Sequence, residues 1–182
     1  MRFYFYCCIV LSLSLQACYF IHHDVTIDNT SSKKLAIEID QEKFILSPKS
    51  FLEVKIRNGM HQVIVRDDSS HQILKKWPTL GIYKDGLLNI CANEYIIQNN
   101  RFINFESVNI KEIPDHSLVL NGYTYQGNLS KTSADKAFIE KCWDRGLDED
   151  ITNIEEVNPA HKILIKIYRI EDFEKDFLRN VR

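Results

Sequence analysis

Residues 35–65 read LAIEIDQEKFILSPKSFLEVKIRNGMHQVIV, and apolar residues occupy every second position over long parts of this segment. Leu35, Ile37 and Ile39 form one such series, in which small or polar residues separate the apolar ones. A period of two is that of a β-strand with one buried face, whereas a helix repeats about every 3.6 residues. Asn58-Gly59 adds the strongest hairpin signal of the chain, because both residue types tolerate the positive φ that a tight primed turn demands. The segment therefore predicts a run of half-buried antiparallel strands.

The surrounding region, roughly residues 24–68, resembles small β-sandwich accessory modules of exported bacterial proteins, namely the PEGA-type and carboxypeptidase-regulatory-like domains. The resemblance is carried by a strand that ends in Leu46-Ser47-Pro48, and by Asn58-Gly59 with His61 just before a Val-rich strand. It implies a binding or spacer module and brings no catalytic residue with it. We therefore expect a β-sandwich-like module over residues 24–78.

A first helix is predicted near residues 133–145. Thr132 and Asp135 are spaced as a capping box, in which each side chain can bond a backbone N–H at the start of a helix. Apolar residues then recur at four-residue steps, which places Phe138 and Cys142 on one face of that helix.

A second helix is predicted near residues 171–179. Phe173 and Phe177 lie one turn apart there, and acidic residues precede Arg179, as the helix dipole prefers. With the extended stretches between them, the two helices make residues 79–182 an α+β region. The chain is thus predicted to be α+β and β-dominated, with antiparallel sandwich-like strands in its N-terminal half and mixed strands plus two short helices in its C-terminal half. Whether the halves share one core stays open at this point.

The first residues have the pattern of an export signal, because an apolar run follows Arg2 and no charged residue stands between Arg2 and His22. Leu15-Gln16-Ala17-Cys18 resembles the lipobox of bacterial lipoproteins. The resemblance implies that the Cys18 thiol carries a diacylglyceryl group with palmitate-like chains, that the new amine is often acylated as well, and that cleavage removes the signal peptide 1–17. Two or three acyl chains hold a protein durably on a membrane, and residues 18–23 would form a short lipid-anchored tether.

Two alternatives to lipidation stay open. An ordinary signal peptidase could cut after Ala17, although Leu15 is large for the position three residues before a cut. The uncharged stretch 3–21 could instead remain as an uncleaved helix, since it is just long enough to span a bilayer. Under the lipoprotein resemblance, Tyr19 stands where many Gram-negative lipoproteins carry an aspartate that retains them in the inner membrane. The expected location is therefore the bacterial cell envelope, at the periplasmic face of the outer membrane in a Gram-negative cell.

Charge and cysteine content bear on nucleic-acid binding and on disulfide formation. The chain has 23 Lys+Arg and 25 Asp+Glu, and this formal net charge of −2 gives no whole-chain attraction to nucleic acid, so we expect no nucleic-acid partner. Of its five cysteines, Cys91 and Cys142 are the pair left after removal of the signal and use of Cys18 for lipid. In an oxidising compartment they form a candidate disulfide, and the alternative is two buried thiols.

Motifs for catalysis or metal binding are not found in the sequence. HExxH, HxH, CxxC, GxSxG and glycine-rich phosphate loops are all absent, so we expect no catalytic residue, no metal site and no cofactor. The acidic cluster at residues 148–150 lacks the glycine and the alternation of a calcium loop and reads as a solvated loop. His22 and His23 stand beside the anchor and read as part of an exposed tether.

Aromatic residues supply the remaining functional hint. Trp77, Tyr83, Tyr123 and Tyr125 are interspersed with Asn and Gln, a mixture that binds sugars or peptides by stacking and hydrogen bonding. Tyr123 and Tyr125 share one face of a strand, so we expect both to pack or both to form an exposed platform. Residues 138–147 and 168–173 also resemble a region of uncharacterised exported bacterial proteins, and that resemblance brings no activity.

Three functional hypotheses follow. The leading one is a non-catalytic, lipid-anchored envelope protein that binds an envelope protein or glycan. The second is a small envelope hydrolase of cell-wall or carbohydrate substrates that would use carboxylates such as Asp148 or Glu155. The third is an inhibitor or immunity-type lipoprotein, which would present a protruding loop to a foreign enzyme.

Overall fold

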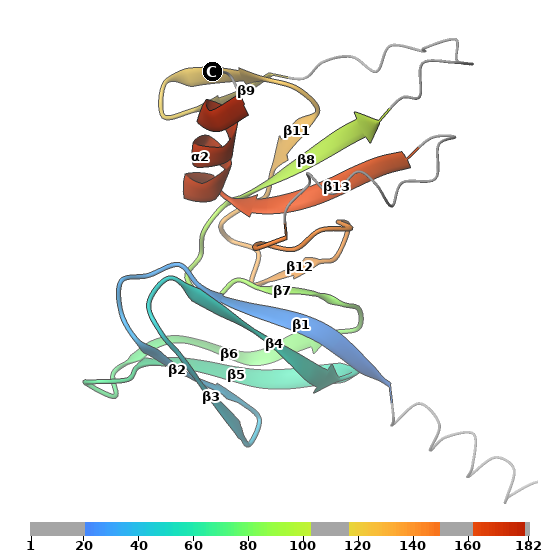
Figure 1. Cartoon of the computed structure of the whole chain (residues 1–182). Helices are drawn as coiled ribbons and strands as arrows, with labels where there is room; N and C mark the ends of the chain where they lie inside the picture. Colours follow the sequence, from blue (N-terminus) through green and yellow to red (C-terminus); the bar gives the residue numbers. More distant parts are fainter. Residues whose placement is uncertain (1–20, 103–116, 150–161, 181–182) are drawn as a thin grey trace, which may run out of the picture. The chain divides into compact units, whose positions relative to one another are not determined.

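A computed structural model describes residues 21–102, 117–149 and 162–180 (Figure 1). They fall into two compact units: the first runs to Ala92 and includes Asp135–Lys141, and the second holds Asn93–Ala134 and the residues from Cys142 onward. Each unit buries its own apolar cluster. The chain is α+β and β-dominated with mainly antiparallel pairing, which confirms the predicted class.

The first unit consists of two four-stranded sheets. One has the order β12-β7-β1-β4 and the other the order β3-β2-β5-β6. The strands of the first sheet are β1 (His22–Asn29), β4 (Ser50–Arg57), β7 (Gly86–Leu88) and β12 (Phe138–Glu140), and those of the second are β2 (Leu35–Ile39), β3 (Glu42–Leu46), β5 (Gly59–Asp67) and β6 (Ile73–Ile82).

The core of the first unit lies between these sheets. Val25 of β1, Ile37 of β2 and Val63 of β5 belong to one buried cluster and are at most 1% exposed. Alternation along each strand supplies such residues to the inner faces of both sheets, as two packed sheets require. The first unit is therefore sandwich-like, as residues 35–65 predict.

The first unit extends beyond the expected boundary at residue 78. Pro78 lies inside β6, an edge strand, near the point where the β5–β6 register shifts between His61 and Val63. An edge strand with an irregular ladder tolerates a residue that lacks an N–H. The chain then adds β7, which pairs with β1 in parallel, and returns after residue 134 to add β12.

The helix predicted near residues 133–145 is wrong. Phe138–Glu140 forms β12 and pairs antiparallel with β7, packed closely over Gly86. Thr132, the expected cap, instead accepts a hydrogen bond at Oγ1 from the backbone N–H of Tyr95 at 2.9 Å. Strand pairing with a distant segment therefore overrides the local four-residue pattern.

The second unit contains a three-stranded sheet, a hairpin and a helix. The sheet has the order β11-β8-β13, and β10 pairs antiparallel with β9. Its elements are β8 (Tyr95–Phe102), β9 (Ser117–Leu120), β10 (Tyr123–Gln126), β11 (Leu129–Lys131), β13 (Lys162–Arg169) and α2 (Ile170–Asn180). Acidic residues occupy the first turn of α2, which confirms the helix predicted near 171–179.

Helix α2 covers the core of the second unit. Phe173 is 2% exposed and meets the rings of Tyr125 and Tyr168 edge to face, with centroids 5.3 and 5.7 Å away. Such contacts add to the stabilisation from apolar burial. Within the described ranges, no helix has both the length and the apolar character needed to cross a bilayer.

Candidate functional site

An open groove lies on the outer face of the β3-β2-β5 part of the first unit, with a volume of about 390 Å³. Residues from three strands and from the loop after β5 line it. They include Ala36, Lys43, Ile45, Arg66, Asp68 and His71.

The small side chain of Ala36 explains the depression. In the sheet register Ala36 lies between Ile45 on β3 and Arg66 on β5. All three belong to the outer face, because their neighbours Ile37, Leu46 and Val65 point into the core. Ile45 remains 51% exposed, so the floor of the groove is apolar while the larger side chains around it form walls.

The loop that follows β5 builds one wall and is held by Asp67. The Asp67 carboxylate accepts hydrogen bonds from the Ser69 hydroxyl at 2.6 Å, the Ser70 N–H at 3.1 Å and the Lys33 ammonium at 2.9 Å. Bonds from Ser69 and Lys33 and from the loop backbone hold the pKa of Asp67 far below its usual range, against the effect of burial. This carboxylate thereby fixes the loop that carries Asp68 and His71.

Asp67→Asn should make the free energy of unfolding vary less with pH in the acid range. Because the pKa of Asp67 is lowered by folding, its carboxylate stabilises the fold fully above the unfolded-state value of about 3.8, and this stabilisation is lost as the pH falls from there toward the folded-state value. We expect the variant to unfold more easily at neutral pH and its difference from wild type to narrow below about pH 3.8. Denaturant unfolding across pH measures this.

Asp68→Asn is the matched control for that measurement. Asp68 pairs with Lys34 at 3.0 Å on the surface, and such pairs add little stability. An equal pH effect in the two variants would contradict the role assigned to Asp67.

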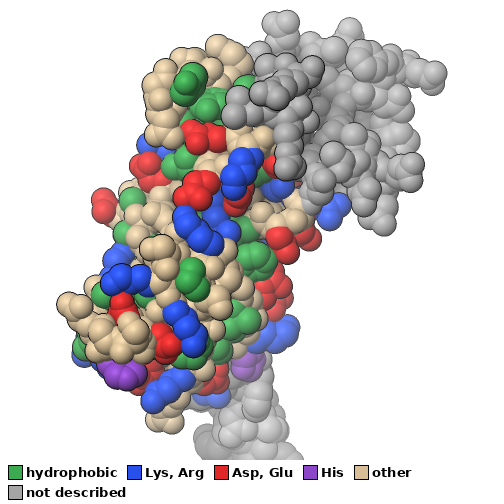
Figure 2. All heavy atoms as spheres, turned by 60° about the vertical axis from the view of Figure 1, so that its left-hand side comes forward, with side chains coloured by type: hydrophobic (Ala, Val, Ile, Leu, Met, Phe, Trp, Pro, Cys, Tyr) green, Lys and Arg blue, Asp and Glu red, His purple; other side chains and the backbone are tan. Residues whose placement is uncertain are grey.

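Charged side chains of both signs line the groove. Asp68 is engaged by Lys34, while within the described part of the chain no ion pair forms at Lys43 or Arg66. Glu38 stands opposite Lys43 in the ladder and is the remaining acid of the lining. Elsewhere on the face drawn in Figure 2, acidic and basic side chains are interspersed. The groove therefore combines an apolar floor with an edge of mixed charge.

A histidine–aspartate pair near the start of β5 is structural. His61 is 6% exposed, with Nδ1 at 2.8 Å from Asp40 Oδ2 and Nε2 at 2.7 Å from the Arg57 carbonyl. Burial raises the pKa of Asp40, but hydrogen bonds from His61 and the Gln62 N–H, with the charges of His61 and Arg57, outweigh it and lower that pKa. Because both imidazole nitrogens already face acceptors, His61 has no lone pair directed at a substrate.

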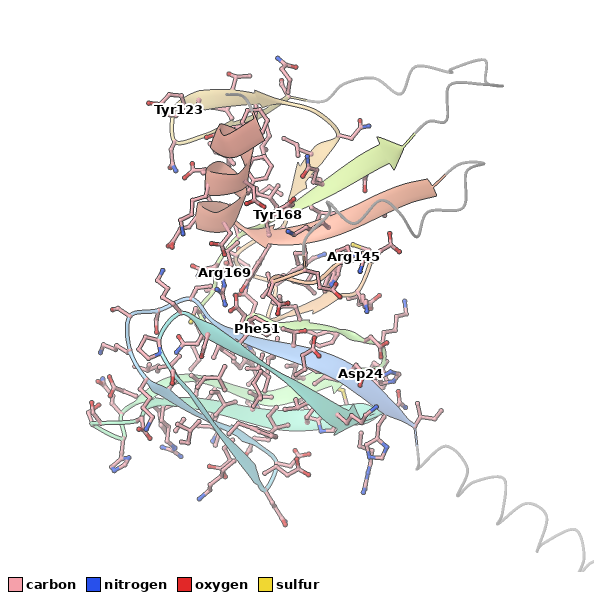
Figure 3. All side chains as sticks on the ribbon, viewed as in Figure 1. Asp24, Phe51, Tyr123, Arg145, Tyr168 and Arg169 are labelled. Atoms are coloured by element: carbon pink, nitrogen blue, oxygen red, sulfur yellow. The ribbon has the colours of Figure 1, made fainter. Side chains whose placement is uncertain are left out.

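The four aromatic residues predicted as a platform are divided between the two units and differ in exposure. Trp77 and Tyr83 belong to the first unit, where Trp77 is packed against the core and Tyr83 is 55% exposed. In the second unit Tyr123 is 70% exposed at the β9–β10 hairpin (Figure 3), whereas Tyr125 is 6% exposed.

The expectation that Tyr123 and Tyr125 are either both packed or both exposed is therefore wrong. The ring of Tyr125 meets Phe177 of α2 edge to face at 4.9 Å, and burial raises the pKa of its hydroxyl. Helix α2 covers Tyr125 and leaves Tyr123, two residues earlier on the same strand, exposed to solvent.

None of the other predicted site residues that the structure describes lines the groove. Cys18 and Glu155 fall outside the described residues, and Asp148 is exposed in a loop. Cys91 and Cys142 are both thiols and belong to different units, so their disulfide stays a prediction. In the described ranges no group of three or more His, Cys, Asp or Glu side chains is placed to hold a metal ion.

The groove residues were missed by sequence reasoning, although one signal pointed to them. Ile45 is an apolar residue at a position that alternation assigns to the outer face, and Ala36 is the smallest residue of its strand. Only the pairing of β2 with both β3 and β5 brings Ala36, Ile45 and Arg66 together.

Comparisons with known proteins add no relative: no family model, no curated protein and no solved structure matches this chain.

Proposed function

We propose that this protein is a lipid-anchored component of the bacterial envelope, held by acylated Cys18, whose folded body binds a protein partner without catalysing a reaction. The observation that carries the proposal is the lipobox-like Leu15-Gln16-Ala17-Cys18 followed almost directly by a folded body, since β1 begins at His22. Acyl chains would confine this body to a membrane surface and raise its effective concentration toward partners there. Tyr19 favours the periplasmic face of the outer membrane in a Gram-negative cell.

The groove supports a protein partner more than a glycan. Sugar binding relies on aromatic faces, and the four candidate aromatic residues are divided between the units, with Tyr125 covered by α2. The apolar floor at Ile45 and the charges of both signs around it instead complement a protein segment that carries an apolar side chain flanked by charged ones.

Ile45→Glu tests the binding part of the proposal. A carboxylate on the floor would place a charge where the apolar side chain of the partner binds. The substitution should not unfold the protein, because the Ile45 side chain is 51% exposed. After cross-linking in intact cells, we expect the full-length variant to recover its main envelope partner about tenfold less than wild type, as loss of a central contact does.

Val119→Glu is the matched control, because Val119 is 62% exposed and lies on β9 of the second unit. It should recover the same partner as wild type. Equal recovery of that partner by Ile45→Glu would refute the groove as the binding surface. Turnover of a cell-wall substrate by the purified protein, abolished by a carboxylate substitution, would refute the non-catalytic reading.

A further inference from the structure

Three exposed apolar residues belong to segments that meet at the end of the first unit where the chain enters it. Ile21, Met60 and Tyr83 are 48%, 59% and 55% exposed. Met60 and Tyr83 lie together over Gly81, since a Cβ built on this glycine would stand 3.4 Å from Met60 Sδ and 2.6 Å from Tyr83 Cε2. We call Ile21, Met60 and Tyr83 the N-terminal tip.

Hydrogen bonds join the segments that carry the N-terminal tip. The Ile21 carbonyl accepts from the Asn58 N–H at 2.8 Å, two residues before Met60. His23 contacts Asn58 Oδ1 at 3.1 Å and Asp85 Oδ1 at 3.4 Å, and Asp85 also accepts from the Asp24 N–H. Figure 3 marks Asp24 at this end of β1. The start of β1, the β4–β5 turn and the β6–β7 turn are therefore fixed to one another.

The length of chain before Ile21 places the N-terminal tip close to the anchor. Only Tyr19 and Phe20 separate Cys18 from Ile21, so their Cα atoms are at most about 11 Å apart even in a fully extended chain. The acyl chains on Cys18 enter the bilayer at that residue. The end of the first unit that carries Ile21 is thus held within reach of the interfacial layer, where tyrosine and apolar side chains are favoured.

The charges at this end balance one another. Lys55 pairs with Asp24 at 3.1 Å, and Lys84, next to Tyr83, pairs with Glu140 at 2.8 Å. Attraction to the surface therefore depends on apolar burial and not on anionic lipid.

We propose that the N-terminal tip inserts into the interfacial layer of the bilayer and orients the first unit on the membrane, with the groove farther along β5 from the bilayer. This rests on the proposed lipid anchor. Met60 and the groove residue Arg66 lie six positions apart along β5, which corresponds to about 20 Å of strand. Apolar contact at Met60 and Tyr83 would thus leave Ile45 open to a partner.

Photo-cross-linking of the lipidated full-length protein tests the proposal. Met60→p-benzoylphenylalanine and Tyr83→p-benzoylphenylalanine are compared with Ile45→p-benzoylphenylalanine, an equally exposed position of the same unit. The purified proteins are reconstituted in vesicles of phosphatidylethanolamine and phosphatidylglycerol, floated and irradiated. We expect the yield of lipid adducts at Met60 and Tyr83 to exceed that at Ile45 by about fivefold or more, because insertion reaches only about 5–10 Å into the interface.

The outcomes separate the inference from the anchor. If the protein floats with the vesicles but gives equal yields of lipid adducts at all three positions, insertion of the N-terminal tip is refuted while the lipid anchor is still supported. Failure of the wild-type protein to float would overturn both. Replacing phosphatidylglycerol with phosphatidylcholine should leave the adduct yields unchanged, and a loss of adducts in that case would contradict apolar insertion.

Discussion

Cys18→Ser should abolish fatty-acid incorporation and release the folded body from the membrane fraction. Serine lacks the thiol that would carry the diacylglyceryl group, and no other acylation site is proposed in the chain. A single acyl chain binds a membrane only reversibly, whereas two or three bind durably. Removing the acylated sulfur should therefore move almost all of the protein from the membrane fraction to the soluble fraction. Labelling with radioactive palmitate, fractionation after an alkaline wash and the intact mass of the product measure the change.

Cys8→Ser is the control, because Cys8 lies in the segment that cleavage would remove. It should leave labelling and membrane retention as in wild type. Wild-type protein whose mass still includes residues 1–17, and a Cys18→Ser variant that stays in the washed membranes, would instead support the uncleaved helix over residues 3–21.

Asn29→Asp should destabilise the first unit by about 3 kcal/mol, although it changes one atom. Asn29 is fully buried, and its Nδ2 donates to the carbonyls of Lys33 and Ser47, each at 2.8 Å. Its Oδ1 accepts from the Ser31 N–H and hydroxyl at 3.0 and 2.6 Å. An aspartate keeps the acceptor and turns a buried carboxylate oxygen toward these two carbonyls, which costs both donated bonds and the desolvation of a charge.

The pH dependence of this penalty identifies its cause. Burial beside carbonyl oxygens should raise the pKa of the new carboxyl above its unfolded value of about 3.9, so the variant should regain stability as the pH falls and its neutral form can donate again. Denaturant unfolding between pH 7 and acid conditions measures this recovery.

Asn58→Asp provides the same chemical change at a different site. The Asn58 side chain meets His23 through its oxygen, which an aspartate retains. We expect an effect within about 0.5 kcal/mol. A similar penalty in the two variants would mean that Asn29 does not depend on its donated bonds.

Alternation and turn chemistry predict local structure well and strand partners less well. Asn121-Gly122 has φ of 49° and 83° and joins β9 to β10 as a paired hairpin. Asn58-Gly59 forms a bend and not a hairpin: Gly59 has a positive φ of 144°, and β4 pairs with β1 while β5 pairs with β2 and β6. The bend crosses from one sheet to the other, because a sandwich lets consecutive strands belong to different sheets.

The site depends even more on pairing than the fold does. Residues that line the groove come from β2, β3, β5 and the following loop, and no local pattern relates Ala36 to Arg66. The four-residue pattern near 133–145 failed for the same reason, since β7 offers a distant partner to Phe138–Glu140.

The return of residues 135–141 to the first unit bears on how such a protein can change by gene rearrangement. β12 covers one edge of β7 but is encoded after β8 to β11 of the second unit. A recombination breakpoint after Ala92 would leave β7 as a bare edge strand, a surface prone to pairing with other chains. The two units are therefore expected to be inherited together, and neither should occur as a shuffled module on its own.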